Sequence, residues 1–234
     1  MKAIFKREFA SFFRSPVGYV FIAITILVFY GVFYLVNITG ETADMSTLFL
    51  FAQMLIALII PLLTMNLISN EYNKKTDQLL LTAPVSVLSI VLGKFFAALS
   101  VIALSLCGTL LIPVVLASIG GFQFWPTVGN YLSTFFFSAA FLAIGIFISS
   151  LTESNFISGI LSWAVFIGLL VVDLMVGSYD TPFTIAVGKW LAFYSRFDNV
   201  RLGIFNISDF LFYASIAAIF LFLTSRMLEK KRYA

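Results

Sequence analysis

Residues that could do chemistry are few in this sequence. It has no histidine, the commonest general base and metal ligand, and its one cysteine, Cys107, cannot form a disulfide within the chain. The patterns of a phosphate-binding P-loop, a serine nucleophile elbow and a zinc-binding histidine pair are all absent. We therefore expect a protein that is not an enzyme, with no catalytic residue, no metal site and no cofactor bound by this chain.

A polar stretch, Asn70–Ser86, separates two long apolar segments. It combines charged residues with leucines, and Pro84 ends any helix at about Ala83, because the residue before a proline disfavours the helical conformation. This pattern predicts a short amphipathic helix at the membrane surface whose leucines face lipid or a partner protein. A loop with solvated charges is the alternative. The candidate interaction residues in this stretch are Glu71, Lys74, Lys75, Thr76, Asp77, Leu79, Leu80 and Pro84.

Three other charged residues lie in or beside apolar segments. Asp173 is the single carboxylate inside a predicted span, where a functional role and hydration near the outer interface are both open. Lys94 stands at the inner end of the third span, and we expect it to snorkel to headgroup phosphates, with a functional pairing as the alternative. Glu153, in a very short inner turn, offers a second small contact for a cytoplasmic partner.

Membrane-spanning helices must position these residues. Of the 234 residues, 61% are hydrophobic and only 11% are charged, whereas a soluble domain is about a quarter charged. Six apolar segments are each close to the ~20 residues that cross a bilayer. Pro61 and Pro113 predict kinks in the second and third of them. The predicted spans are Val17–Val36, Leu48–Ser69, Phe95–Ile119, Tyr131–Leu151, Phe156–Val176 and Phe210–Ser225.

The remaining segments complete an all-α integral membrane protein with one domain over residues 1–234. Met1–Ser15 is basic and places phenylalanines at helical spacing, which predicts an amphipathic helix in the membrane interface rather than a signal peptide. Gly177–Ser208 mixes aromatic and charged residues and is too polar to be a seventh span. We expect it to form one or two short helices that re-enter or lie on the outer leaflet before the last span.

The lysines and arginines predict the orientation of the chain, because cytoplasmic loops are enriched in them. With the N-terminus inside, six spans place eleven of the fourteen basic residues on the inner side, and both termini are then cytoplasmic. The eleven are Lys2, Lys6, Arg7, Arg14, Lys74, Lys75, Lys94, Arg226, Lys230, Lys231 and Arg232.

The polar stretch also carries a family resemblance. Glu71, Lys75-Thr76, Leu79-Leu80, Thr82–Ser86 and Gly93-Lys94 resemble the first cytoplasmic loop of type-2 ABC transporter permeases. The order of segments along nearly the whole chain is similar to that of small six-span permeases of gliding motility and nitrous-oxide-reductase maturation. Lys75 stands where that family often has a glycine, and Asp77-Gln78 stand where a glutamate is frequent.

This resemblance implies the transmembrane permease subunit of an ABC exporter. A separate subunit would hydrolyse ATP, with Mg, and drive export of a substrate or extrusion of lipid or polymer. Asn70–Ser86 would be the coupling helix that docks on this ATPase, and Gly177–Ser208 would hold the short re-entrant helices. The implied partners are the ATPase, a second permease copy or paralogue and membrane lipid, with no nucleic acid. The implied location is the bacterial plasma (inner) membrane, crossed several times.

Two other functions stay open at this point. An ion-coupled secondary transporter or channel would ordinarily use intramembrane acids or bases as relays, and Asp173 alone is available. The chain could instead be a structural subunit of a larger membrane assembly.

Overall fold

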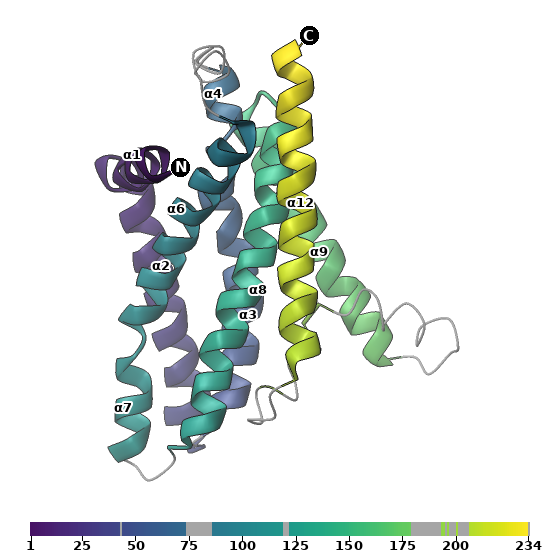
Figure 1. Cartoon of the computed structure of the whole chain (residues 1–234). Coiled ribbons are helices and arrows are strands. Elements are labelled where there is room, and N and C mark those ends of the chain that lie inside the picture. The colour runs from purple at the N-terminus through teal and green to yellow at the C-terminus, as the bar shows by residue number, and fades with distance from the viewer. Residues whose placement is uncertain are drawn as a thin grey trace.

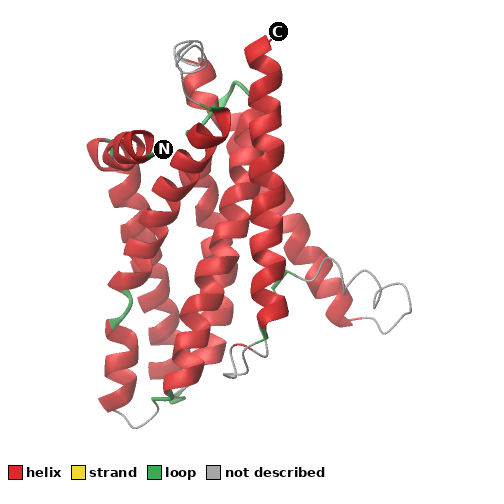
Figure 2. Cartoon of the chain, in the orientation of Figure 1, coloured by secondary structure: helices red, strands yellow, loops and turns green. Residues whose placement is uncertain are grey.

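The computed structural model describes residues 1–42, 44–73, 86–118, 122–178, 193, 194, 196, 200 and 206–233. Every regular element in these residues is a helix (Figure 2), so the predicted all-α fold class is confirmed. In chain order these are α1 (Lys2–Arg14), α2 (Pro16–Phe33), the π-helix η1 (Tyr34–Ile38), α3 (Met45–Thr64), α4 (Ser69–Asn73), α6 (Val87–Gly108), α7 (Leu111–Ser118), α8 (Phe124–Leu151), α9 (Asn155–Ser178) and α12 (Ile207–Tyr233).

Within these residues, six helical segments are long and apolar enough to cross a membrane, as predicted. They are Pro16–Ile38, Met45–Tyr72, Val87–Ser118, Phe124–Leu151, Asn155–Met175 and Ile207–Lys231. Figure 1 shows both termini and α4 at the same end of the bundle, which we call the terminal end, while α7 lies at the opposite, far end. An even number of crossings requires this arrangement.

The helix α1 lies across the terminal end rather than along the bundle (Figure 1). Ser15 is extended and Pro16 is the first residue of α2, a position where the missing N–H and fixed φ of proline fit a helix start. Phe5, Phe9 and Phe13 lie along one side of α1; the first two rings are stacked with centroids 5.9 Å apart, and the last two are tilted with centroids 5.0 Å apart. The predicted N-terminal helix is therefore present, with Glu8 and Phe12 on its buried side.

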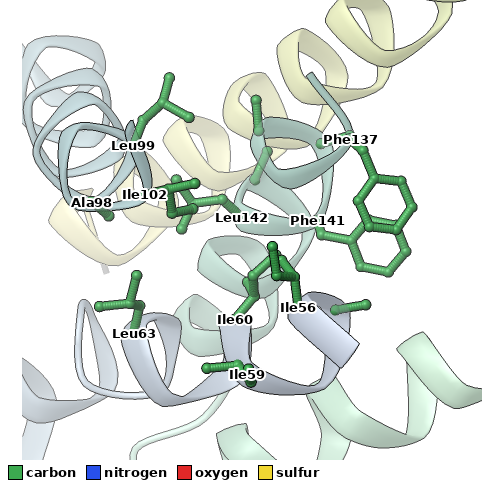
Figure 3. Close-up of a cluster of buried hydrophobic side chains, with 14 of the residues drawn as sticks. Ile56, Ile59, Ile60, Leu63, Ala98, Leu99, Ile102, Phe137, Phe141 and Leu142 are labelled. Atoms are coloured by element: carbon green, nitrogen blue, oxygen red, sulfur yellow. The ribbon is translucent and has the colours of Figure 1, made fainter. Parts of the chain in front are cut away.

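The core lies where α3, α6 and α8 meet (Figure 3). Buried side chains of all three helices form one cluster, and the rings of Phe137 and Phe141 of α8 are tilted by 31° with centroids 4.4 Å apart. In the most apolar part of α8, 78% of the residues are buried, against 22% for α9, so α8 is the central span and α9 is peripheral. Figure 1 shows α9 diverging from the bundle towards the far end.

Several spans are longer than the sequence indicated, and the fourth begins at Phe124 rather than Tyr131. The third begins at Val87 rather than Phe95, and the sixth covers Ile207–Tyr233, so it needs no snorkelling to reach across a bilayer. The kink predicted at Pro113 lies one turn earlier, where α6 ends and α7 begins. Proline cannot bond the carbonyl four residues before it, and here Tyr131 Oη donates to that carbonyl, Thr109 O, at 2.9 Å.

Most of the predicted external segment Gly177–Ser208 lies outside the described residues, so its re-entrant helices stay a prediction. Of the residues that are described there, Phe193 and Tyr194 are buried against the bundle. Tyr213 Oη of α12 donates to Phe193 O, and the Phe193 ring lies 5.5 Å from that of Phe141 in α8. This part of the segment therefore packs on α8 and α12.

Candidate functional site

The short helix α4 is the described part of the polar stretch predicted to bind a partner. Its neighbours Lys74, Lys75, Thr76, Asp77, Leu79, Leu80 and Pro84 lie outside the described residues. Turns at residues 65–68 interrupt the helix between α3 and α4 near the end of the segment Met45–Tyr72, and side chains of other helices contact α4 there. Three successive groups of contacts hold it, at Ser69, Glu71 and Tyr72.

Glu71 forms an ion pair with Lys94 of α6, and the Lys94 Nζ–Glu71 Oε1 distance is 2.7 Å. Lys94 Nζ also donates to Leu67 O at 2.8 Å and lies 3.4 Å from Glu8 Oε2 of α1. Its side chain is only 2% exposed, so the expectation that it snorkels to lipid headgroups is wrong. Because α6 begins at Val87, Lys94 lies inside the helix, and its ammonium group makes two hydrogen bonds and one further ion pair.

Glu8 is the residue of this cluster that the sequence did not single out. It pairs with Arg7 at 2.6 Å, and Arg7 Nη2 lies 3.8 Å from Glu71 Oε1. The four side chains carry two positive and two negative charges, so the buried charge of Lys94 is compensated. One signal was present in the sequence, because Glu8 is the single acid in the basic stretch Met1–Ser15.

Ser69, the first residue of α4, is fixed by α8 and α9. Ser149 Oγ of α8 accepts the backbone N–H groups of Ile68 at 3.2 Å and Ser69 at 3.1 Å. Ser69 Oγ donates to Asn155 Oδ1 at the start of α9, at 2.8 Å. The side chains thus supply partners for backbone groups that the break after α3 leaves without helical bonds.

Tyr72 connects α4 to α12, since Lys231 Nζ lies 3.6 Å from the centroid of its ring. This is cation–π geometry, and it brings the basic end of α12 onto α4. The predicted contact residue Glu153 is exposed in the turn between α8 and α9, the two helices that hold Ser69. Helix α4 is therefore contacted by side chains from α1, α6, α8, α9 and α12.

A polar cavity of about 320 Å³ lies beside the ion cluster. Side chains of α1 and α6 and the α3–α4 region line it, among them Glu8, Ser11, Asn66, Asn70 and Lys94. It contains carboxylates and amides but no activated nucleophile. Among the described residues no three histidine, cysteine or acidic side chains come together as metal ligands. The arrangement brings two positive and two negative side chains together at the terminal end of the bundle.

Asp173 is separate from this cluster, in the half of α9 nearer the far end, and is half-buried. Its charge acts on Tyr194: burial and, secondarily, the Asp173 carboxylate raise the pKa of the Tyr194 hydroxyl above its ordinary value. A functional role for Asp173 stays a prediction.

Six apolar helical segments with a charged cluster at one end define a multi-pass membrane protein. The chain belongs to the ABC-2 family of transporter proteins, because the model of that family, described as "ABC-2 family transporter protein", matches residues 2–233. No curated protein matches the chain. The family resemblance found in the sequence is thereby confirmed.

Proposed function

We propose that this chain is the permease subunit of an ABC exporter, and that α4 transmits the movement of a separate ATPase to the spans. The observation that supports this is the convergence of five helices on the five residues of α4, at the base of the stretch Asn70–Ser86. A surface loop without a mechanical role needs no such set of contacts. The ATPase would dock on Asn70–Ser86 and Glu153 and would itself hold ATP and Mg.

Each contact of α4 gives one route for this movement. Glu71 acts on α6 through Lys94 and on α1 through Arg7. Ser69 acts on α8 and α9, and Tyr72 acts on α12. When ATP closes the nucleotide-binding subunits, α4 moves with the docked stretch. The spans then shift from one packing to another, and the polar contacts of α4 differ between the two.

The other parts of the complex follow from the same proposal. Two permease subunits, identical or paralogous, form the transport path, as the six spans of one chain line only one side of it. The terminal end faces the cytoplasm of a bacterial cell, where ATP is available. The surrounding membrane lipid contacts the exposed faces of α2, α9 and α12.

The variant Glu71→Gln tests the proposal. It keeps an oxygen that accepts from Lys94 but removes the charge, so we expect a stability cost of about 1–3 kcal/mol without unfolding. The complex should still hydrolyse ATP, but the spans should no longer change their packing when it does so. The readout is the labelling rate of Gln123→Cys, an exposed far-end position, with and without ATP and vanadate in a Cys107→Ser background.

The matched control is Glu229→Gln, which removes an acid of α12 that pairs with the exposed Arg226 at 2.9 Å. This variant should keep the ATP-dependent change in labelling, because an exposed pair contributes at most about 1 kcal/mol. An unchanged ATP response in Glu71→Gln would remove α4 from the mechanism. Purification of the wild-type chain without any ATP-binding protein would contradict the proposed subunit role itself.

A further inference from the structure

An apolar groove runs along the outside of the bundle between α6, α8 and α12. It encloses about 420 Å³ and is lined by hydrocarbon side chains, among them Leu88, Leu99, Phe136, Ala139, Ala217 and Phe222. Leu88 and Phe222 at its edge are 47% and 52% exposed, so the groove opens towards the surroundings of the bundle. Its floor at Ala217 and Ala139 is only 8% exposed.

The groove covers half of the membrane depth. Its lining on α12 extends from Tyr213 to Phe222 and its lining on α6 from Leu88 to Leu99. At ~1.5 Å per residue these stretches are roughly 14 and 16 Å long, about half of a ~30 Å hydrocarbon core. On α6 the groove begins at the terminal end, because Leu88 is in the first turn of α6 and α1 crosses α6 at Gly93, where Ile4 lies against the glycine. On α12 the lining is in the middle of the helix, Tyr213–Phe222 of Ile207–Tyr233.

Positive charge lies at the mouth of this groove. The guanidinium of Arg226 lies 5.0 Å from the centre of the Phe222 ring, one turn beyond the groove, and its side chain is 63% exposed. One N–H group of Arg226 donates to Glu229, and guanidinium has five. From Arg226 to the end of α12 there are four basic residues and one acid. Such a basic turn attracts anionic headgroups.

We propose that this groove binds one acyl chain of an anionic phospholipid from the leaflet at the terminal end, with its phosphate against Arg226. The volume is in the range of ligand pockets. A depth of one leaflet fits an acyl chain, whereas a spanning helix of a second copy would need a partner surface along the full thickness. A second hollow of about 220 Å³ on α6 and α8 shares Phe135 with the groove, which places that ring between the two hollows.

The experiment uses the purified full chain in lipid nanodiscs that contain phosphatidylglycerol with a photoactivatable diazirine in its acyl chain. After irradiation, mass spectrometry of peptides locates the lipid adducts. We expect them to concentrate on the groove residues of α6 and α12. Ala218→Trp, at an exposed position that lines the groove, should abolish most of these adducts. Ile219→Trp is the control, since Ile219 is 55% exposed and lies outside the groove.

The headgroup is tested independently. Arg226→Gln should lower phosphatidylglycerol adducts in the groove about fivefold, the effect of one lost cation near an anionic lipid. Adducts of zwitterionic phosphatidylethanolamine carrying the same diazirine should change little, and Lys230→Gln should resemble the wild type with both lipids. Both readouts leave buried residues untouched, and thermal unfolding verifies the fold.

Three outcomes overturn the proposal. Equal adducts in Ala218→Trp and Ile219→Trp would show that the groove has no special affinity for acyl chains. Equal loss of both lipids in Arg226→Gln would remove the charge recognition. Crosslinks between groove residues and a second copy, in place of lipid adducts, would identify the occupant as protein.

Discussion

At the scale of residues, the chain places a lysine inside a membrane bundle and compensates its charge completely. Lys94 is 2% exposed and has Glu71, Glu8 and Leu67 O as partners. Removing one partner of such a buried charge is far more costly than removing an exposed pair. The cluster therefore fixes the register of α4 against α6 and α1.

The sequence predicts one acidic residue of this cluster, Glu71, as an interaction residue, but not its partners. These partners, Lys94 and Arg7, are 23 and 64 residues away in the sequence. A lysine near the end of a predicted span has two ordinary solutions, snorkelling or pairing, and only the packing of α1 against α6 decides between them. Glu8 could not be assigned because its partner is in another helix.

Ser149 gives a prediction at this scale. Ser149→Ala removes the acceptor of two buried backbone N–H groups, those of Ile68 and Ser69, and should cost about 1–3 kcal/mol of unfolding free energy. Thermal unfolding of the purified chain in detergent measures it. Ser100→Ala is the control, because the Ser100 hydroxyl donates to Phe96 O, a carbonyl of its own helix. Equal melting temperatures for the two variants would show that α4 does not depend on Ser149.

At the scale of elements, α3 and α8 approach closely because Gly145 has no side chain. A Cβ at this position would lie 2.5 Å from Thr64 Oγ1 and 2.8 Å from Thr64 Cβ. Thr64 is buried and β-branched, so it has little freedom to move away. The last turn of α3, directly before the break that precedes α4, is thereby pressed onto α8.

Gly145→Ala should therefore destabilise the protein by about 1–3 kcal/mol, the usual cost of overpacking. Gly168→Ala in α9 is a matched control, because a Cβ there meets no atom within 4 Å. That variant should gain up to about 1 kcal/mol from the higher helix propensity of alanine. Denaturation in detergent measures the change in unfolding free energy, which should be opposite in sign for the two variants. A stabilised Gly145→Ala would contradict the close packing of α3 and α8.

The helices themselves were largely predictable, whereas their ends were not. Hydropathy predicted six spans because the bilayer fixes their length. It placed the start of the third span at Phe95, after Lys94, and that of the fourth at Tyr131, whereas these helices begin at Val87 and Phe124. It indicated the kink near Pro113 and could not identify Tyr131 as the donor to Thr109 O, because the two residues meet only in the folded bundle.

At the scale of the whole molecule, the two termini and α4 share one end, as the distribution of basic residues predicts (Figure 1). Thr76→Cys in a Cys107→Ser background tests which side this is. In sealed vesicles, a membrane-impermeant maleimide should label Thr76→Cys only from the cytoplasmic face. Gln123→Cys, at the start of α8 at the far end, should be labelled only from the opposite face. Labelling of both positions from one face would invalidate the six-span topology.

The size of α4 has a consequence for the direction of control. Five residues make less than two helical turns, so this element cannot bend between its attachments at Ser69, Glu71 and Tyr72. A rigid α4 transmits movement from the ATPase to the spans and from the spans to the ATPase. If binding of cargo in the bundle favours one packing of the spans, thermodynamic reciprocity requires that the same cargo alter the nucleotide affinity of the motor. Binding of cargo to the permease would then affect the ATPase through α4, the same helix through which the ATPase moves the spans.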